Sequence, residues 1–388
     1  MKTGTFGCPF FCGCRLRSCH RERTYVCSDN RAMDRRQFVV AAASSALAPS
    51  GLAAQWPVVV PGTPLRFPRD HGAHPEFRTE WWYLTAWLRD PAGHDLGVQI
   101  TFFRSRPGLQ ELSSSRFAPD QLLFAHAAIA DASHGRLRHD QRSARAGFDL
   151  ASASTTTTDV RIGDWRLTLF DNTYRVQIDA GDFSLELKCE EARAIQLQGD
   201  RGVSRKGLRQ HQASWYYSHP QLRVTGTLHR NGQRRVTLTG TGWLDHEWFS
   251  ELLDDRATGW DWCGINLHDG GSLMAFRIRD HGGGQAWAGG SRQLASGAAK
   301  SLSPHEIRFL PLRFWRSPRT GVGYPVVMDV TAGGERLTLE PMFDDQELDA
   351  RATTGTLYWE GAVRATVDNR EVGRGYLELT GYGQRVRF

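Results

Sequence analysis

Short runs of alternating hydrophobic and polar residues dominate the chain, and Gly, Pro, Asp and Asn separate them. Helical periodicity is scarce. Alternation with a period of two is typical of β-strands that bury one face, so the pattern predicts an antiparallel sheet protein. Clear strands are expected at 82–88 and 96–104. A hairpin is expected where Asn231-Gly232 separates 223–229 from 235–243, because Asn-Gly favours tight hairpin turns.

The pattern begins again after Asp261. The strand–turn–strand pattern at 262–279 resembles the one at 82–104, and each half of the chain closes on a similar Gly-rich strand. A meander of about eight strands can close around one small ligand. We therefore predict an all-β fold with two consecutive lipocalin-like antiparallel β-barrels, at 55–250 and 251–388. One large sandwich without duplication is the alternative.

Two polar segments, 109–119 and 151–158, are predicted to be loops that connect strands. Both are rich in Ser, and the second is a run of Ser and Thr. For the second segment we favour the simplest interpretation, an exposed loop that only connects two strands.

An export signal is expected near the start of the chain. Arg35-Arg36 precedes a short apolar stretch rich in small residues, which ends at Leu52-Ala53-Ala54. This order is typical of a twin-arginine signal, which predicts a periplasmic or secreted protein. A Sec signal or a hydrophobic first helix are the alternatives. We expect 1–54 to be this signal plus an over-extended N-terminus, with the true start at Met33.

Charge and cysteine are concentrated in the same leader. Residues 1–54 carry five of the six net positive charges, so the remainder is nearly neutral. This gives no support for binding nucleic acid. Five of the seven cysteines also lie there, leaving Cys189 and Cys263. These two could form one disulfide in an oxidising compartment or remain buried thiols.

The densest group of candidate functional residues is Gly242–Phe249, followed by Gly259–Trp262. In a strand, residues i and i+2 share a face. Leu244, His246 and Trp248 should therefore lie on one face, and Asp245, Glu247 and Phe249 on the other. An imidazole beside an indole can exchange protons next to an apolar surface, so we predict a functional site here.

Four segments resemble the AttH/carotenoid 1,2-hydratase family, which includes hydroxyneurosporene synthase and kievitone hydratase. They are Phe67–Thr85, Trp215–Pro220, Gly242–Trp248 and Gly259–Trp262, and the match covers essentially all of 65–388. The resemblance implies two lipocalin-like barrels with a cavity for a lipophile at or near their junction. It implies hydration of a carbon–carbon double bond without a cofactor. It also implies an ABC transporter as a partner, because AttH-like proteins tend to accompany transporter genes.

The resemblance carries over only at particular residues. The hydratases have a His-x-Trp pair, matched here by His246 and Trp248, and an aspartate beside a tyrosine, for which Asp261 is the candidate. Its neighbours are Trp260 and Trp262 instead of tyrosine. This departure weakens an assignment to carotenoid substrates and to hydratase activity.

Hydration of an alkene begins with protonation of carbon, which needs an acid that burial keeps protonated. We predict Asp261 as that acid and His246 as the base for the attacking water, with Trp248 stabilising the cation. The remaining expected ligand-binding residues are the aromatic and acidic side chains around this pair: Trp243, Trp260, Trp262, Trp82, Tyr83, Asp245, Glu247 and Glu80. The structural alternative is that the acids pair with arginines.

A metal site and a phosphate site are both considered and not predicted. His71, His74 and Glu76 could bind a metal with His126, His219 or His246, but a Pro-containing segment does not place both histidines on one helical face. The Gly-rich runs lack the context of a phosphate loop, and no Gly-x-Ser-x-Gly elbow is present. No metal and no cofactor are expected.

The sequence thus predicts an exported, monomeric hydratase-like protein that acts on an apolar small molecule of isoprenoid, polyene or lipid type. A non-catalytic lipophile carrier for an envelope ABC transporter is the main alternative. A hydrolase that uses Glu247 or Glu80 as general base is a third.

Overall fold

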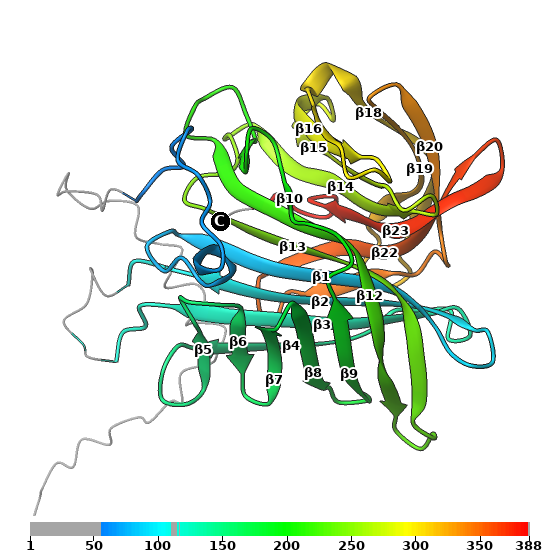
Figure 1. The fold of residues 1–388 in the computed structure, drawn as a ribbon, viewed down its shortest axis with the longest axis horizontal. Coiled ribbons are helices and arrows are strands. Elements are labelled where there is room, and N and C mark those ends of the chain that lie inside the picture. Colours follow the sequence, from blue (N-terminus) through cyan, green and yellow to red (C-terminus); the bar gives the residue numbers. More distant parts are fainter. Residues whose placement is uncertain (1–55, 110–114, 116, 387–388) are drawn as a thin grey trace, which may run out of the picture. The chain divides into compact units, whose positions relative to one another are not determined.

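The computed structural model describes residues 56–109, 115 and 117–386. The predicted export signal, Met33 and the five N-terminal cysteines lie outside these residues, and most of the predicted loop at 109–119 does as well. The part from Ala54 to Phe388 forms one compact unit. Within it the chain folds into two large antiparallel sheets (Figure 1).

The first sheet has the strand order β4-β3-β2-β1-β13-β12-β9-β8-β7-β6-β5, and β10 and β11 also pair with β12. A short 3-10 helix, η1 (Arg69–His71), precedes it. Its strands are β1 (Thr79–Arg89), β2 (Asp95–Ser105), β3 (Leu122–Asp131), β4 (Arg138–Arg145), β5 (Ala151–Ala153), β6 (Asp159–Ile162), β7 (Trp165–Phe170), β8 (Thr173–Asp179), β9 (Phe183–Glu190), β10 (Gln196–Leu197), β11 (Val203–Arg205), β12 (Ala213–Arg230) and β13 (Val236–Phe249).

The second sheet has the order β17-β16-β15-β14-β23-β22-β20-β19-β18, and β21 pairs with β22. The 3-10 helix η2 (Pro304–Glu306) precedes β18. Its strands are β14 (Ala257–Leu267), β15 (Ser272–Asp280), β16 (Gln285–Gln293), β17 (Ala299–Leu302), β18 (Ile307–Arg316), β19 (Gly323–Ala332), β20 (Glu335–Pro341), β21 (Glu347–Ala350), β22 (Thr356–Val367) and β23 (Arg370–Thr380).

Each sheet curls until its distant strands approach one another: β3 and β4 contact β6 in the first, and β15 and β16 contact β18 in the second. The predicted all-β fold of two consecutive lipocalin-like barrels is therefore confirmed. We call them the first and second barrel. The change from one to the other falls between β13 and β14, which belong to different sheets although they are consecutive in the chain.

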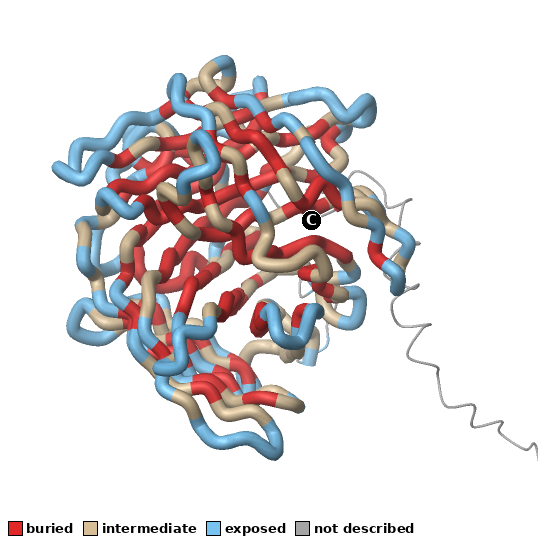
Figure 2. The backbone as a smooth tube through the Cα atoms, turned by 90° about the vertical axis from the view of Figure 1, so that its right-hand side faces the viewer, coloured by how far each residue is buried: buried red, intermediate tan, exposed pale blue. Residues whose placement is uncertain are grey.

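Strand alternation sorts the buried side chains into separate cores. One apolar cluster fills the first barrel, a second fills the second barrel, and a third lies where the two sheets face each other. On β13, Leu244 belongs to the first core and Trp243 to the third. On β14, Cys263 belongs to the second core and Trp262 to the third. Figure 2 shows that buried backbone follows the strands while exposed residues gather in the loops.

One strand was missed, and one predicted loop contains a strand. Strand β4 was missed because its sequence, Arg138–Arg145, is polar on both faces; it is an end strand of the first sheet and half-exposed along most of its length. Residues 151–158 were predicted to be an exposed loop, but Ala151–Ala153 forms β5, and buried Thr158 donates a hydrogen bond from its hydroxyl to the carbonyl of His71 at 2.8 Å.

Cys189 and Cys263 are both free and buried, one in each barrel. The two cysteines are therefore separate thiols and do not form the disulfide that was the other predicted alternative. Burial raises the pKa of each thiol to about 12, so neither is a ready nucleophile. Among the described residues, no helix has the length and apolar character that crossing a membrane would require.

Candidate functional site

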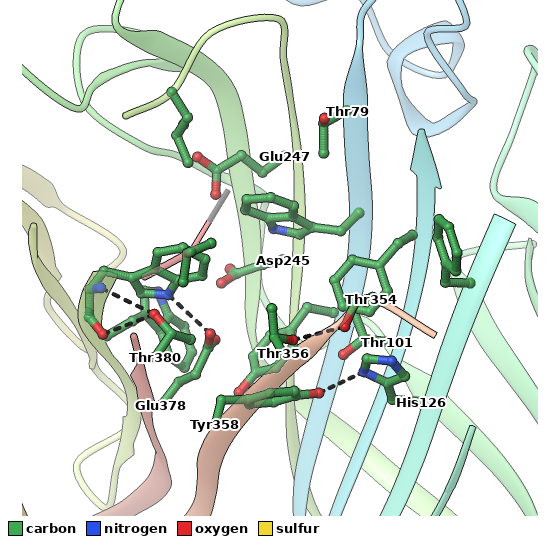
Figure 3. A pocket seen from close by; sticks show the side chains of 18 of the residues that line it. Thr79, Thr101, His126, Asp245, Glu247, Thr354, Thr356, Tyr358, Glu378 and Thr380 are labelled. Atoms are coloured by element: carbon green, nitrogen blue, oxygen red, sulfur yellow. Dashed lines mark hydrogen bonds between the residues drawn. The ribbon is translucent and has the colours of Figure 1, made fainter. Parts of the chain in front are cut away.

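A cavity of about 310 Å³ lies between the two barrels, and we call it the junction cavity. Strands β1, β2, β3, β12 and β13 contribute its wall from the first barrel, and β14, β15, β22 and β23 from the second (Figure 3). Each strand turns one set of alternate residues toward its own barrel interior. The other set faces the neighbouring sheet, and it is this set that lines the cavity.

Aromatic side chains form a large part of the wall. Trp81, Trp260, Trp262, Tyr216 and Phe276 border the space. Indole N–H groups in this wall have polar partners: Trp262 donates to the Tyr216 hydroxyl at 3.1 Å, and Trp260 donates to Glu378 at 3.0 Å. These bonds fix the ring planes, and the cavity is left with an apolar, electron-rich surface.

The position of Trp262 depends on a glycine two residues further along β14. A Cβ atom at Gly264 would lie 2.5 Å from the Trp262 ring and 3.1 Å from the Trp243 ring. Both indoles pack over this point because Gly264 has no side chain. The glycine is therefore part of the way the sequence shapes the cavity wall.

Four carboxyl groups interrupt the apolar wall. Asp245 and Glu247 come from β13, Glu360 from β22 and Glu378 from β23. Glu360 and Glu378 are direct partners in the antiparallel register of β22 and β23. Their side chains therefore project from the same face of the sheet, side by side. Figure 3 shows the Asp245 and Glu378 carboxyl groups pointing into the same space.

Three of these carboxyl groups bind their protons more tightly than usual. Burial raises the pKa of Asp245 to about 7, against the effect of hydrogen bonds from Ser218, Tyr216 and Trp243. Burial also raises the pKa of Glu378 to about 8, and the negative charges of Asp245 and Glu247 add to this. The pKa of Glu360 lies well above its usual value, first because it is buried and then because Glu378 is near.

Asp245 is held by a dense set of donors. It accepts hydrogen bonds from the Ser218 hydroxyl at 2.5 Å, the Tyr216 hydroxyl at 2.6 Å and the Trp243 indole at 2.7 Å. Glu360 accepts one from the Tyr83 hydroxyl. These donors fix each carboxyl group in position at the cavity wall.

Glu247 differs from the other three because a cation compensates it. The Lys206 ammonium lies 2.8 Å from one carboxylate oxygen, and the Ser214 hydroxyl donates to the same oxygen at 2.5 Å. Lys206 itself lies over the rings of Tyr216 and Phe276. This end of the cavity thus holds an ion pair, whereas no cation among the described residues compensates Glu360 or Glu378.

A neutral histidine lies on the opposite wall of the cavity. His126 is within hydrogen-bond distance of the Tyr358 hydroxyl through Nδ1, at 2.7 Å, and of the Thr353 hydroxyl through Nε2, at 2.9 Å. Burial lowers the pKa of His126 to about 3, so the imidazole is uncharged at neutral pH. A neutral imidazole donates a hydrogen bond from one ring nitrogen and accepts one at the other, so His126 can bind both hydroxyls without adding a charge to the cavity.

Some of the predicted site residues lie in the junction cavity. Asp245, Glu247, Trp260, Trp262 and Tyr83 line it. The prediction that alternate residues of β13 face opposite sides is confirmed. Trp243 lies behind the wall and supports Asp245 through its indole N–H.

The predicted base lies elsewhere. His246 and Trp248 project into the first barrel, as do Glu80 and Trp82. There His246 Nε2 lies 2.8 Å from Glu80, and its Nδ1 lies 2.9 Å from the Tyr217 hydroxyl. Burial lowers the pKa of His246 to about 4.

The predicted acid lies inside the second barrel. Asp261 is fully buried, and the Arg277 guanidinium donates to it at 2.5 Å, with Arg279 at 3.1 Å. The Tyr382 hydroxyl donates to it at 2.9 Å. Asp261 is therefore paired with arginines, as the structural alternative predicted.

The predicted pair of His246 and Asp261 is therefore not formed. Among the described residues that line the junction cavity, neither appears. The two strands that carry them belong to different sheets, and each side chain points toward the interior of its own barrel. Proximity in sequence was misleading because the chain passes from one barrel to the other between them.

Several cavity residues were missed by sequence reasoning: Glu360, Glu378, Tyr216, Tyr358 and His126, the last considered only as a metal ligand. One signal was available. The face of β22 that carries Glu360 also carries Tyr358 and Ala362, and on β23 Glu378 shares its face with Tyr376. An acid in such a position is expensive to bury and is a functional candidate.

The fold and the cavity define a protein of two lipocalin-like barrels that enclose an acidic, aromatic site between them. The model of the AttH-like family matches residues 58–382, and the chain belongs to that family. A crystal structure of a candidate AttH from Nitrosomonas europaea is 48% identical over 84% of this chain and 100% of that chain, with a TM-score of 0.80.

Kievitone hydratase from Nectria haematococca has the same fold. It is 14% identical over 85% of this chain and 94% of that chain, with a TM-score of 0.64. At this identity the likeness concerns the fold alone. A comparison with curated proteins gives no match.

Proposed function

We propose that this AttH-like protein is a hydratase-like enzyme that adds water to a carbon–carbon double bond of an apolar small molecule in the junction cavity. The observation that carries the proposal is the placement of Glu360 and Glu378 side by side in an aromatic cavity, opposite Asp245. The fold shared with kievitone hydratase supports the same class by analogy.

The geometry suggests how such a reaction would proceed. A protonated carboxyl group, Glu378 or its partner Glu360, gives its proton to one carbon of the double bond. The positive charge that develops on the other carbon lies against the indole faces of Trp260 and Trp262. Water attacks this carbon and loses a proton to the carboxylate just formed. The double bond has then gained one water, and the acid is restored.

The raised pKa values match this role. A carboxyl group with a pKa of about 8 is mostly protonated at neutral pH, which an ordinary glutamate is not. A general acid must still hold its proton at the working pH, and burial among aromatic side chains provides this here. No cofactor enters the proposed steps.

The predicted alternative, a non-catalytic lipophile carrier, would need only the aromatic wall. The carboxyl groups favour chemistry over storage, because a carrier for a neutral lipophile gains nothing from burying Glu360 beside Glu378. We also propose, from the sequence alone, that the protein is exported through the Arg35-Arg36 signal, is monomeric and acts beside an ABC transporter. Lysine substitutions at Arg35 and Arg36 should leave it in the cytoplasm, measured by cell fractionation.

The test uses the full chain, incubated with isoprenoid and polyene alkenes in water labelled with ¹⁸O. We expect an alcohol that contains one ¹⁸O atom, detected by mass spectrometry. Glu378→Gln should lower its rate of formation by about 10²–10⁴-fold, as expected for loss of a general acid. Glu340→Gln is the matched control, since Glu340 is exposed on β20. Binding of the alkenes without labelled product would support the carrier instead.

A further inference from the structure

A second group of polar side chains lies inside the first barrel, away from the junction cavity. Its centre is His74, Glu80 and His246, which we call the His–Glu cluster. One ligand-type atom from each residue lies within 4.8 Å of the other two. All three side chains are buried, at 2%, 0% and 0% exposure. The proposed hydration does not use this cluster, so a role for the cluster is independent of that reaction.

We propose that the His–Glu cluster is a binding site for one divalent transition metal ion, with Zn²⁺ as the best fit. The ligands would be His74 Nδ1, His246 Nε2 and Glu80 Oε1. Two imidazoles and one carboxylate form a common zinc donor set that leaves a further coordination position open. Soft thiolate ligands are absent from the cluster, whose nitrogen and oxygen donors suit Zn²⁺ better than Cu(I).

The three donor atoms already converge. Glu80 Oε1 lies 2.8 Å from His74 Nδ1 and 2.8 Å from His246 Nε2. Around a tetrahedral zinc ion such separations are about 3.3 Å, because each zinc–ligand bond is about 2.0–2.1 Å. Each histidine nitrogen would therefore move away from Glu80 Oε1 by only about half an ångström to admit the ion. The two histidine nitrogens already lie within 4.8 Å of each other.

The outer atoms of the ligands are oriented as metal ligands require. His74 Nε2 lies 3.3 Å from the Asp70 carboxylate, and His246 Nδ1 lies 2.9 Å from the Tyr217 hydroxyl. With a proton on each of these outer nitrogens, the inner nitrogens turn lone pairs toward Glu80 Oε1. Carboxylate–histidine–metal arrangements of this kind fix the tautomer of the ligand.

The hydroxyl of Tyr217 allows that tautomer. It lies between His246 Nδ1 and His71 Nδ1, at 2.9 Å and 3.1 Å. A hydroxyl donates one hydrogen bond and accepts others, so it can accept from His246 and donate to His71. Metal binding at His246 Nε2 then requires only that protons shift within the hydrogen-bonded row of His246, Tyr217 and His71.

The carboxylate is supported in the same way. The second oxygen of Glu80 accepts from Arg104 Nε at 2.7 Å and from the backbone N–H of His74 at 2.9 Å. Arg104 also binds the carbonyls of His74 and Phe77, which anchors the segment that carries His74. Glu80 Oε1 is thereby aimed at the two histidines.

Aromatic stacking holds the two imidazole rings. The His74 ring stacks on Trp248 with centroids 3.7 Å apart and an angle of 5°, and the His246 ring stacks on Trp82 at 4.7 Å and 24°. In the same interior, neither ring nitrogen of buried His219 has a hydrogen-bond partner among the described residues. The site is thus preorganised. The two nitrogens of His219 show that the barrel interior around it also contains polar atoms without a hydrogen-bond partner among the described residues.

This proposal revises the expectation of no metal. The sequence pointed to His71, His74 and Glu76, but Glu76 is half-exposed and faces Arg69 at 3.8 Å. Glu80 takes its place because β1 begins at Thr79 and turns Glu80 inward, opposite Trp248 in the register with β13.

The test measures metal directly. The full chain, treated with chelator and then offered Zn²⁺, should bind one zinc per chain by calorimetry and elemental mass spectrometry. X-ray absorption at the zinc edge should show nitrogen and oxygen ligands without sulfur. His246→Gln and Glu80→Gln should lose this binding. His126→Gln, a buried histidine outside the cluster, should keep it.

A variant outside the ligand set guards against misfolding. Asp70→Asn replaces the charged acceptor of His74 Nε2 by a neutral amide, and it should weaken zinc binding by about 10–100-fold. Because Asp70 also accepts hydrogen bonds from the Arg66 backbone N–H and from Arg69, thermal unfolding of the metal-free variant is measured alongside and should show a folded protein at the temperature of the binding assay. The proposal is overturned if the folded wild-type chain binds no zinc. It is equally overturned if His246→Gln and Asp70→Asn both bind zinc as the wild type does, which would indicate surface histidines.

Discussion

Glu360 and Glu378 lie directly opposite each other on β22 and β23, with both carboxyl groups at the wall of the junction cavity. Two carboxylates in such positions repel each other, so the pair holds at least one proton well above the usual pH range. The partner strand thus helps to keep an acid protonated, and burial of both carboxyl groups acts in the same direction.

Turnover should depend on pH through the protonated form of Glu378. Its pKa is about 8, so the acid is available below that pH and is lost above it. We expect the hydration rate to fall by about tenfold per pH unit on the alkaline side. Glu378→Gln should remove this limb, leaving a low and flatter profile. A wild-type rate that stays constant from neutral pH to well above 8 would contradict the assignment.

Stability should depend on pH in the same direction. The carboxyl of Glu378 titrates near 4.5 when unperturbed and near 8 in the folded chain. Its contribution to stability is therefore fully present below about 4.5 and is lost as the pH rises to about 8.

Buried neutral histidines such as His126, whose pKa is lowered, act in the opposite sense. Only the difference between variants isolates Glu378. The wild type should lose more free energy of unfolding than Glu378→Gln between pH 5 and 8, measured by urea titration.

Tyr216→Phe should disturb both sides of the cavity. The Tyr216 hydroxyl donates to Asp245 and accepts from the Trp262 indole. Without it, a buried N–H loses its acceptor and the carboxyl loses a donor, at a cost of about 1–3 kcal/mol. A double-mutant cycle with Asp245→Asn, followed by urea unfolding, should give a coupling energy well above experimental error. Strict additivity would show that this hydrogen bond is not formed.

Gly264→Ala should be destabilising although it adds a single methyl group. The new Cβ would meet the Trp262 ring at 2.5 Å, and the indole cannot retreat past Trp243. Overpacking of this kind costs about 1–3 kcal/mol. Gly323→Ala is the matched control, because no atom lies within 4 Å of a Cβ added there. Thermal unfolding of the two variants compares them directly, and equal melting temperatures would contradict the packing described here.

The sequence was sufficient for the fold and for the faces of individual strands. Alternation placed Asp245 and Glu247 on one side of β13 and His246 on the other, and the structure agrees. The same reasoning failed for β4, where both faces are half-exposed and alternation carries no information. The alternation of hydrophobic and polar residues reflects which side chains are buried. It therefore identifies a strand only when one face is buried and the other is exposed.

The site could not be assembled from sequence because it depends on which faces meet. Asp245 and Glu378 line the same cavity only because the two sheets pack with the faces that carry them toward each other. No local sequence pattern specifies that packing. Glu360 and Glu378 become partners through the register of one hairpin. His246 and Asp261 looked like a pair because they are close in the chain, yet the chain changes barrels between them.

The variant Asp261→Asn distinguishes the acid predicted from the sequence, Asp261, from the acid proposed from the structure, Glu378. Because Arg277 and Arg279 are both held by Asp261, its neutralisation would leave two buried or half-buried guanidinium groups without their carboxylate. Loss of one partner of a buried ion pair costs about 3–5 kcal/mol. We expect a large fall in stability, with turnover per folded molecule within a few-fold of the wild type at low temperature.

Glu378→Gln should give the reverse result at neutral pH: a folded protein with little turnover. Unfolding curves and active-site titration on the same preparations distinguish the two outcomes. If Asp261→Asn instead remained stable and lost turnover while Glu378→Gln kept it, the acid would lie inside the second barrel. The junction cavity would then be a path for the substrate, and not the place of proton transfer.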